Sequence, residues 1–130
     1  MLIADNIIRH HFRNIYFVTG GACGGKTTVA RHLADKYGML LYNWDEHFPE
    51  YQAIATPADQ PAMSRRNTFA SWEEYFMRPP HEYAAWLEQT FQEQTGMAVA
   101  DLIRLSGSAG DRKIIVDGFF TVELLKKISS

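Results

Sequence analysis

Three short apolar runs lie along the chain, and each is typical of a β-strand. They are Asn14–Gly20 (NIYFVTG), Met39–Trp44 (MLLYNW) and Arg112–Phe120 (RKIIVDGFF). The first combines β-branched and aromatic residues without polar alternation, which indicates a strand buried on both faces, as in parallel sheets. We therefore expect an α/β protein with a parallel sheet.

A helical pattern follows the first run. The stretch TTVARHLADKYG (27–38) carries apolar residues at helical spacing, and Gly38 is a typical C-terminal stop. The N-terminal segment MLIADNIIRHHF predicts a short helix leading into the first strand. Residues 1–44 thus predict a βαβ unit behind a short helix.

Residues 45–112 form a different kind of segment. Its first part, DEHFPEYQAIATPADQPAMSRRN, contains three prolines and predicts mainly loop with short helical turns. Ser71 and Glu74 form a capping-box pattern, and the stretch after Pro80 predicts a helix, either continuous or broken at Gly96. We interpret 45–112 as a helical insertion that covers one end of the sheet. Residues 113–130 then supply the third strand and a helix with Thr121 as N-cap.

The glycine-rich loop between the first strand and helix carries the most specific motif. Its residues satisfy the pattern G-x-x-x-x-G-K-[ST]: Gly20, Gly21, Ala22, Cys23, Gly24, Gly25, Lys26 and Thr27. Glycines let backbone N–H groups approach a phosphate chain, and the helix N-terminus favours the same anion. Lys26 would neutralise phosphate charge and the Thr27 hydroxyl would ligate Mg²⁺. The alternative is a glycine-rich turn with a chance lysine.

Two residues in this loop region allow either a functional or a purely structural interpretation. Thr28 either directs a hydroxyl toward the α-phosphate or simply fits the helix. Cys23 lies near a helix N-terminus and a lysine, which could make its thiol reactive, but we favour the alternative that a variable loop position simply tolerates cysteine.

Carboxylates follow the second and third predicted strands. Asp45 comes directly after Trp44, and Asp117 ends the apolar run IIVD. Ligands of parallel α/β sheets bind at the C-terminal strand ends. An apolar run followed by Asp is typical of a Walker-B pattern, which predicts Asp117 beside Mg²⁺ opposite Thr27. The alternative is a plain turn at a strand end.

With these residues the chain resembles P-loop kinases of the nucleoside/nucleotide kinase-like group, which includes adenylate and shikimate kinases. The segment IIVDGFFT (114–121) is similar to the LDGFPRT segment of adenylate kinases. The resemblance implies a three-layer α/β/α P-loop NTPase fold, ATP and Mg²⁺ as cofactors, and a catalytic role for Lys26. It implies a sheet order of 2-3-1-4-5, of which this chain supplies strands 2-3-1.

The positions where the chain departs from adenylate kinases bear on which kind of molecule would accept the phosphoryl group. Their Pro-Arg is replaced by Phe120-Thr121, so the arginine that would grip an acceptor phosphate is missing. A hydroxyl acceptor benefits from a carboxylate that takes its proton, which favours Asp45 as catalytic and substrate-binding. Arg65 and Arg66 could instead bind an acceptor phosphate, or form an exposed basic pair.

Three functions remain open at this point. The first is a kinase, or a piece of one, that phosphorylates a small-molecule hydroxyl such as that of a nucleoside or metabolite. The second is a nucleoside monophosphate kinase. The third is a nucleotide-binding protein without catalysis that acts by association. No residues remain for the fourth and fifth strands, so the chain is a fragment, a short form, or a homo-oligomer closed through the open sheet edge.

The composition of the chain argues against two classes of binding partner, nucleic acids and membranes. The chain of 130 residues has room for one domain, a net charge of -2 and no Lys/Arg-rich run, which argues against nucleic acid. It contains no stretch of eighteen apolar residues, so we expect no membrane partner. Its single cysteine and the lack of a secretory signal favour a reducing cytoplasm.

Overall fold

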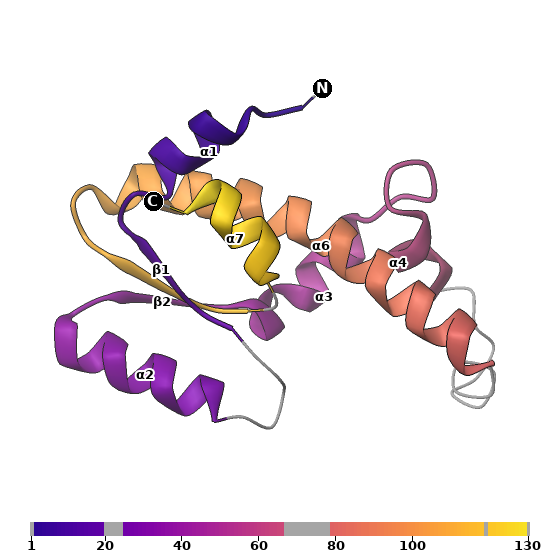
Figure 1. The fold of residues 1–130 in the computed structure, drawn as a ribbon, viewed down its shortest axis with the longest axis horizontal. Helices are drawn as coiled ribbons and strands as arrows, with labels where there is room; N and C mark the ends of the chain where they lie inside the picture. The colour runs from indigo at the N-terminus through magenta and orange to yellow at the C-terminus, as the bar shows by residue number, and fades with distance from the viewer. Residues whose placement is uncertain (1, 20–24, 67–78, 119, 130) are drawn as a thin grey trace. The chain divides into compact units, whose positions relative to one another are not determined.

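The structure is a computed structural model that describes residues 2–19, 25–66, 79–118 and 120–129, without the side chain of Arg66. Two compact units divide the chain: Met1–Glu46 with Ala98–Ser130, and His47–Met97. The elements, in chain order, are α1 (Asp5–His11), β1 (Ile15–Val18), α2 (Lys26–Tyr37), β2 (Leu40–Asn43), α3 (Trp44–Ile54), α4 (Pro61–Arg66), α6 (Pro80–Ala109), β3 (Ile114–Asp117) and α7 (Val122–Ile128) (Figure 1).

The first unit contains a parallel sheet in the order β1-β3-β2. Val18 and Asn43 both align with Asp117, so the three strands end level with one another. The predicted α/β class, the parallel sheet and the order 2-3-1 are confirmed. The strands are shorter than the apolar runs because α3 already begins at Trp44 and Gly118 follows the last paired residue of β3.

One face of the sheet packs against α2. Its core consists of Ala30 and Ala34 on the helix and Ile115 on β3, surrounded by Val18, Leu33 and Met39. Two alanines at a helical spacing of four let the helix backbone approach the sheet closely. This packing holds the first turn of α2 next to the C-terminal end of β3.

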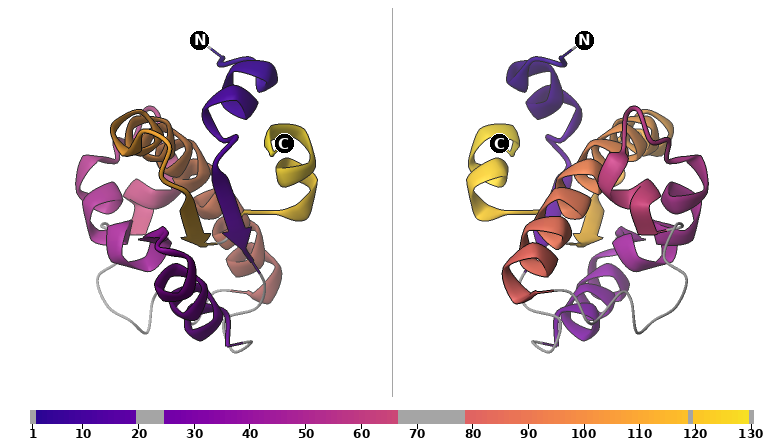
Figure 2. Two further views of the ribbon diagram at one scale, coloured as in Figure 1. Left: turned by 90° about the vertical axis from the view of Figure 1, so that its left-hand side faces the viewer. Right: turned by 90° about the vertical axis from the view of Figure 1, so that its right-hand side faces the viewer.

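The opposite face is covered by aromatic rings. Phe17 contacts both Phe12 and Phe120, and Trp44 contacts Phe120 with ring centroids 4.9 Å apart. Offset and edge-to-face pairs of this kind add stability beyond the buried area. Figures 1 and 2 show α2 on one side of the sheet and α1 and α7 on the other.

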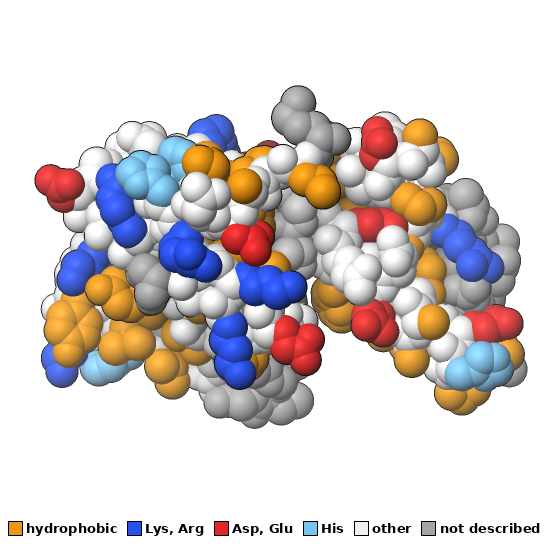
Figure 3. Space-filling model, turned by 45° about the horizontal axis from the view of Figure 1, so that its top comes forward, with side chains coloured by type: hydrophobic (Ala, Val, Ile, Leu, Met, Phe, Trp, Pro, Cys, Tyr) orange, Lys and Arg blue, Asp and Glu red, His pale blue; other side chains and the backbone are white. Residues whose placement is uncertain are grey.

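Helices α1 and α7 are joined at their ends. The Arg9 guanidinium donates to the carbonyl of Lys127 in the last turn of α7, where a cation is favourable. The surface over these helices carries Lys, Arg and His side chains with Asp and Glu among them (Figure 3).

One sequence prediction about helices needs correction, and one alternative is decided. Residues 44–54 are not mainly loop but the helix α3, which contains Pro49. Pro49 is the sixth residue of α3, so its missing N–H removes one helical hydrogen bond near the start. The α6 helix runs unbroken through Gly96 and Gly107 and ends at Ala109, where Gly110 adopts a left-handed conformation.

The second unit is built on the contact of α4 with α6. Glu93 accepts hydrogen bonds from the N–H groups of Ala62 and Met63, at 3.0 and 2.9 Å. Trp86 Nε1 donates to the carbonyl of Ala62 at 2.9 Å. These bonds satisfy backbone groups in the first turn of α4 that a helix leaves unpaired. The described helices include none that is long and apolar enough to span a membrane.

Candidate functional site

The N-terminus of α2 opens directly from the glycine-rich loop. Gly25 is its N-cap, with a φ of 72°, a left-handed conformation that favours glycine. Among the residues that the structure describes, no side chain caps this end, and the first turn contains no acidic residue. By contrast, α7 is capped by the Thr121 hydroxyl and has Glu123 in its first turn. The start of α2 therefore retains the positive dipole end that favours an anion.

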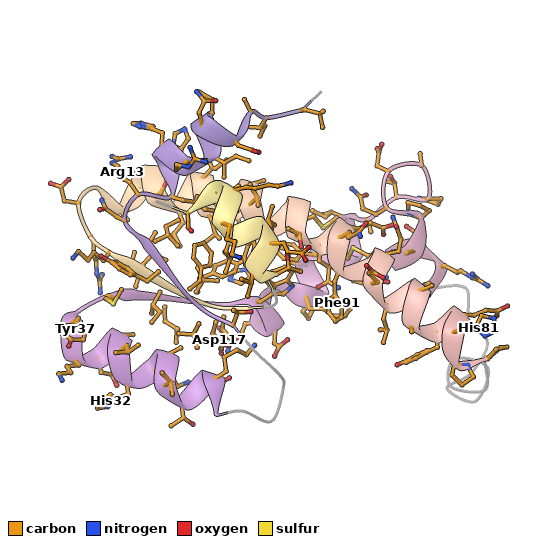
Figure 4. All side chains as sticks on the ribbon, in the orientation of Figure 1. Arg13, His32, Tyr37, His81, Phe91 and Asp117 are labelled. Carbon is orange, nitrogen blue, oxygen red and sulfur yellow. The ribbon has the colours of Figure 1, made fainter. Side chains whose placement is uncertain are left out.

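Lys26 and Thr27, the first two residues of α2, both contact Asp117. Lys26 Nζ lies 3.1 Å from Asp117 Oδ1, and Thr27 Oγ1 donates to Asp117 Oδ2 at 2.7 Å. Figure 4 labels Asp117 at the end of β3, on the side of the sheet that faces α2. The structure thus brings together three of the residues that the sequence predicts at this site.

The Asp117 carboxylate is almost fully buried. Its side chain is 3% exposed and that of Lys26 is 9% exposed. A buried charge is tolerated only with a partner and hydrogen bonds, which Lys26 and Thr27 supply here. A polar group of this kind at the C-terminal strand ends lies where parallel sheets bind ligands.

Gly118 is a participant that the motif alone does not predict. Its carbonyl accepts from Lys26 Nζ at 3.5 Å, so the lysine reaches two consecutive residues at the end of β3. A Cβ at Gly118 would lie 2.7 Å from Trp44 Cε3. The Asp-Gly pair therefore serves both the polar site and the close packing of Trp44, and the DG dipeptide was the only sequence signal for it.

Asp45 lies near the same end of the sheet but apart from this group of contacts. It is exposed in the first turn of α3, and its N–H is bound by Asn43 Oδ1 at 3.0 Å. Asn43 aligns with Asp117 at the end of the sheet, and Asp45 comes two residues after Asn43 in the chain. In the part of the chain that the structure describes, its carboxylate makes no hydrogen bond or ion pair.

Arg65 belongs to the second unit, where it lines a cavity of about 550 Å³ between α4 and α6. Arg66 ends α4, and its side chain lies outside the described set. The sequence predicted Arg65 as substrate-binding but did not single out the other lining residues, Pro61, Ala62, Glu82, Ala85, Trp86 and Gln89. No sequence motif marks them, because they meet only when α4 packs on α6.

Part of the predicted loop falls outside the described residues. This is true of the segment from Gly20 to Gly24, including Cys23, and of the capping box Ser71–Glu74. Thr28 is described and is exposed in the first turn of α2.

The residues present fit a magnesium ion. Mg²⁺ is typically held by one or two protein oxygens together with phosphates and water, and Thr27 and Asp117 provide a hydroxyl and a carboxylate side by side. Within the described ranges no cluster of three or more His, Cys, Asp or Glu residues could hold a metal by itself. The further ligands of a metal here would come from water or from a bound molecule.

Comparisons of the chain with protein-family models, curated proteins and solved structures find no match.

Proposed function

We propose that the chain is an ATP-binding kinase of the P-loop type that transfers the γ-phosphoryl group to a hydroxyl of a small molecule. The observation that carries the proposal is the convergence of Lys26 and Thr27 on the buried Asp117. This convergence occurs at the N-terminus of a helix that directly follows a complete G-x-x-x-x-G-K-[ST] loop.

Each residue of the group has a distinct role in this proposal. The Lys26 ammonium, 3.1 Å from Asp117, belongs to the first residue of α2 and would bind the β- and γ-phosphates. Thr27 and Asp117 would hold Mg²⁺, which when bound neutralises charge on the transferred phosphoryl group. The uncapped first turn of α2 adds backbone donors and its dipole.

Asp45 is the proposed group for the acceptor. It follows β2 just beyond the strand ends and is exposed, so its carboxylate can reach a ligand without breaking an ion pair of the fold. A carboxylate there would orient the acceptor hydroxyl and take its proton as the oxygen attacks phosphorus. The use of ATP and the single cysteine fit a cytoplasmic location.

The experiment compares ATP binding by calorimetry with ADP release across a panel of nucleosides and small metabolites. Lys26→Ala should lower ADP release roughly 10²–10³-fold by removing a cation from the transferred phosphate. Lys36→Ala, in the exposed last turn of α2, is the matched control and should behave like the unmodified chain. Equal effects of the two substitutions would contradict the proposal.

Asp45→Asn separates transfer from nucleotide binding. It should reduce ADP release while ATP affinity stays the same. Asp35→Asn, which changes an exposed carboxylate of α2, is its control. Full activity in Asp45→Asn would remove Asp45 from its role. ATP binding without ADP release for any acceptor would instead support the non-catalytic nucleotide-binding protein.

A nucleoside monophosphate kinase is the second candidate, favoured by the position of Arg65 at a cavity wall. Its guanidinium could bind the acceptor phosphate as a paired donor. In that case Arg65→Gln should raise the KM of a monophosphate acceptor and leave that of a nucleoside unchanged. An unchanged KM for both acceptors would exclude this candidate.

A further inference from the structure

The cavity between α4 and the first turns of α6 has the size of a small-molecule site. Its volume is about 550 Å³, within the range of ligand pockets, and all its lining residues belong to the unit His47–Met97. Apolar atoms of Pro61, Ala62, Ala85 and Trp86 form its walls, and Arg65, Glu82 and Gln89 add polar groups.

The walls of this cavity are held in place by hydrogen bonds across the two helices. Trp86 is 6% exposed, and its indole N–H is fixed to the carbonyl of Ala62. Glu93 holds the first turn of α4 through two backbone N–H groups. A rigid aromatic wall reduces the conformational entropy that a ligand must remove on binding.

The polar groups at the cavity are the guanidinium of Arg65, the carboxylate of Glu82 and the amide of Gln89. Gln89 donates through Nε2 to Glu93 at 3.1 Å, and its Oε1 remains an acceptor that a ligand could use. The Glu82 side chain is exposed and makes no ion pair or hydrogen bond with any part of the chain that the structure describes. An ionised carboxylate and an amide oxygen next to an indole ring select a ligand that brings donors and a flat apolar surface.

We propose that this cavity binds a small planar molecule whose ring carries hydrogen-bond donors, of the chemical class of the nucleosides. The ring packs along Trp86, and its N–H or hydroxyl groups donate to Glu82 and Gln89. Glu82 gives the stronger of these bonds because it is charged. That this ligand is the phosphoryl acceptor rests on the proposed function, whereas the binding itself does not.

The test uses the indole N–H signal of Trp86 in a proton–nitrogen NMR spectrum of the full chain. The chain has three tryptophans, and Trp86→Phe assigns the signal. Adenosine, guanosine, cytidine and uridine are titrated without ATP or magnesium, and ribose serves as a probe with hydroxyls but no aromatic ring. At least one nucleoside should shift the Trp86 signal with saturation, and ribose should not. No saturable shift with any nucleoside, or an equal shift with ribose, overturns the proposal.

Single substitutions test whether the nucleoside binds in this cavity. Glu82→Gln, which keeps the shape and removes the charge, should weaken nucleoside affinity about tenfold. Glu88→Gln, on the same helix but outside the cavity lining, should leave it unchanged. Equal affinities for the two variants count against the site. Lys26→Ala should bind the nucleoside normally, so the failure of the kinase proposal and the failure of this one can be told apart.

Discussion

At the scale of single residues, Gly118 links the candidate site to the core. A side chain at this position would meet the indole ring of Trp44, which is 1% exposed and cannot move aside. We expect Gly118→Ala to destabilise the chain by about 1–3 kcal/mol through overpacking. Urea unfolding followed by circular dichroism measures the change.

Gly107 provides the matched control for this substitution. It lies within α6 in the same compact unit, and a Cβ there would meet no atom within 4 Å. Gly107→Ala should therefore leave stability unchanged or raise it by up to about 1 kcal/mol, because alanine favours the helix. If both glycine variants lost the same stability, close packing at Gly118 would not be the cause.

The contacts of Lys26, Thr27 and Asp117 were predictable because each belongs to a motif with a fixed place on strand, loop or helix. The role of Gly118 was not, because it depends on Trp44, a residue distant in sequence. Asp45 was correctly placed after the second strand, but its role depends on a ligand that the sequence does not define.

At the scale of elements, α4 depends on a cap from another helix. The Glu93 carboxylate accepts from two N–H groups in its first turn, and a six-residue helix is too short to be stable alone. We expect Glu93→Gln to weaken these charge-assisted bonds by about 1–2 kcal/mol. Hydrogen exchange at the amides of Ala62 and Met63 should become faster.

Glu88→Gln is the control for this measurement, because Glu88 is exposed on α6 and belongs to no cap. It should leave amide exchange in α4 unchanged. Faster exchange throughout α6 in Glu93→Gln, rather than in α4, would contradict the capping role.

The strands and α2 were predictable from local pattern, since buried apolar runs and helical spacing need no distant information. The start of α3 was not, because three prolines in 45–67 favour loops, and only Pro49 falls inside the helix. For α6, the sequence left open whether the helix continues through Gly96 or breaks there, and the structure shows the continuous helix. A glycine weakens a helix by about 1 kcal/mol, which the packing of Trp86 on Ala62 and the core position of Leu102 outweigh.

At the scale of the whole molecule, β1 is an edge strand of the sheet, and its outer side pairs with no other described strand. Asn14 and Val18 direct their carbonyls to β3, so the alternation of the strand directs the backbone groups of Phe17 to the other side. Among the described residues, β1 pairs with β3 alone. All four β1 residues are apolar or aromatic, so the strand itself contains no lysine or proline that would discourage pairing.

The apolar surface continues from this edge onto α2. Tyr16 is 48% exposed and Tyr37, labelled in Figure 4, is 63% exposed. Both line a hollow of about 440 Å³ together with Leu33, Met39, Lys113 and Ile115. A second copy that added its own β1 in antiparallel pairing would satisfy the free backbone groups and cover this surface by two-fold symmetry.

We therefore propose that the chain self-associates through β1. Sedimentation velocity over a concentration series should show a shift from monomer to dimer. Tyr16→Glu places a charge beside the edge, next to Lys113, and should shift the chain to monomer without loss of fold. Ile54→Glu changes a more exposed apolar residue in the other unit, 61% exposed, and should leave the dimer intact. A monomer at every concentration would show that β1 is not an interface. The same response to both substitutions would show this too, because pairing through β1 is disturbed by a charge at Tyr16 and not by a charge at Ile54.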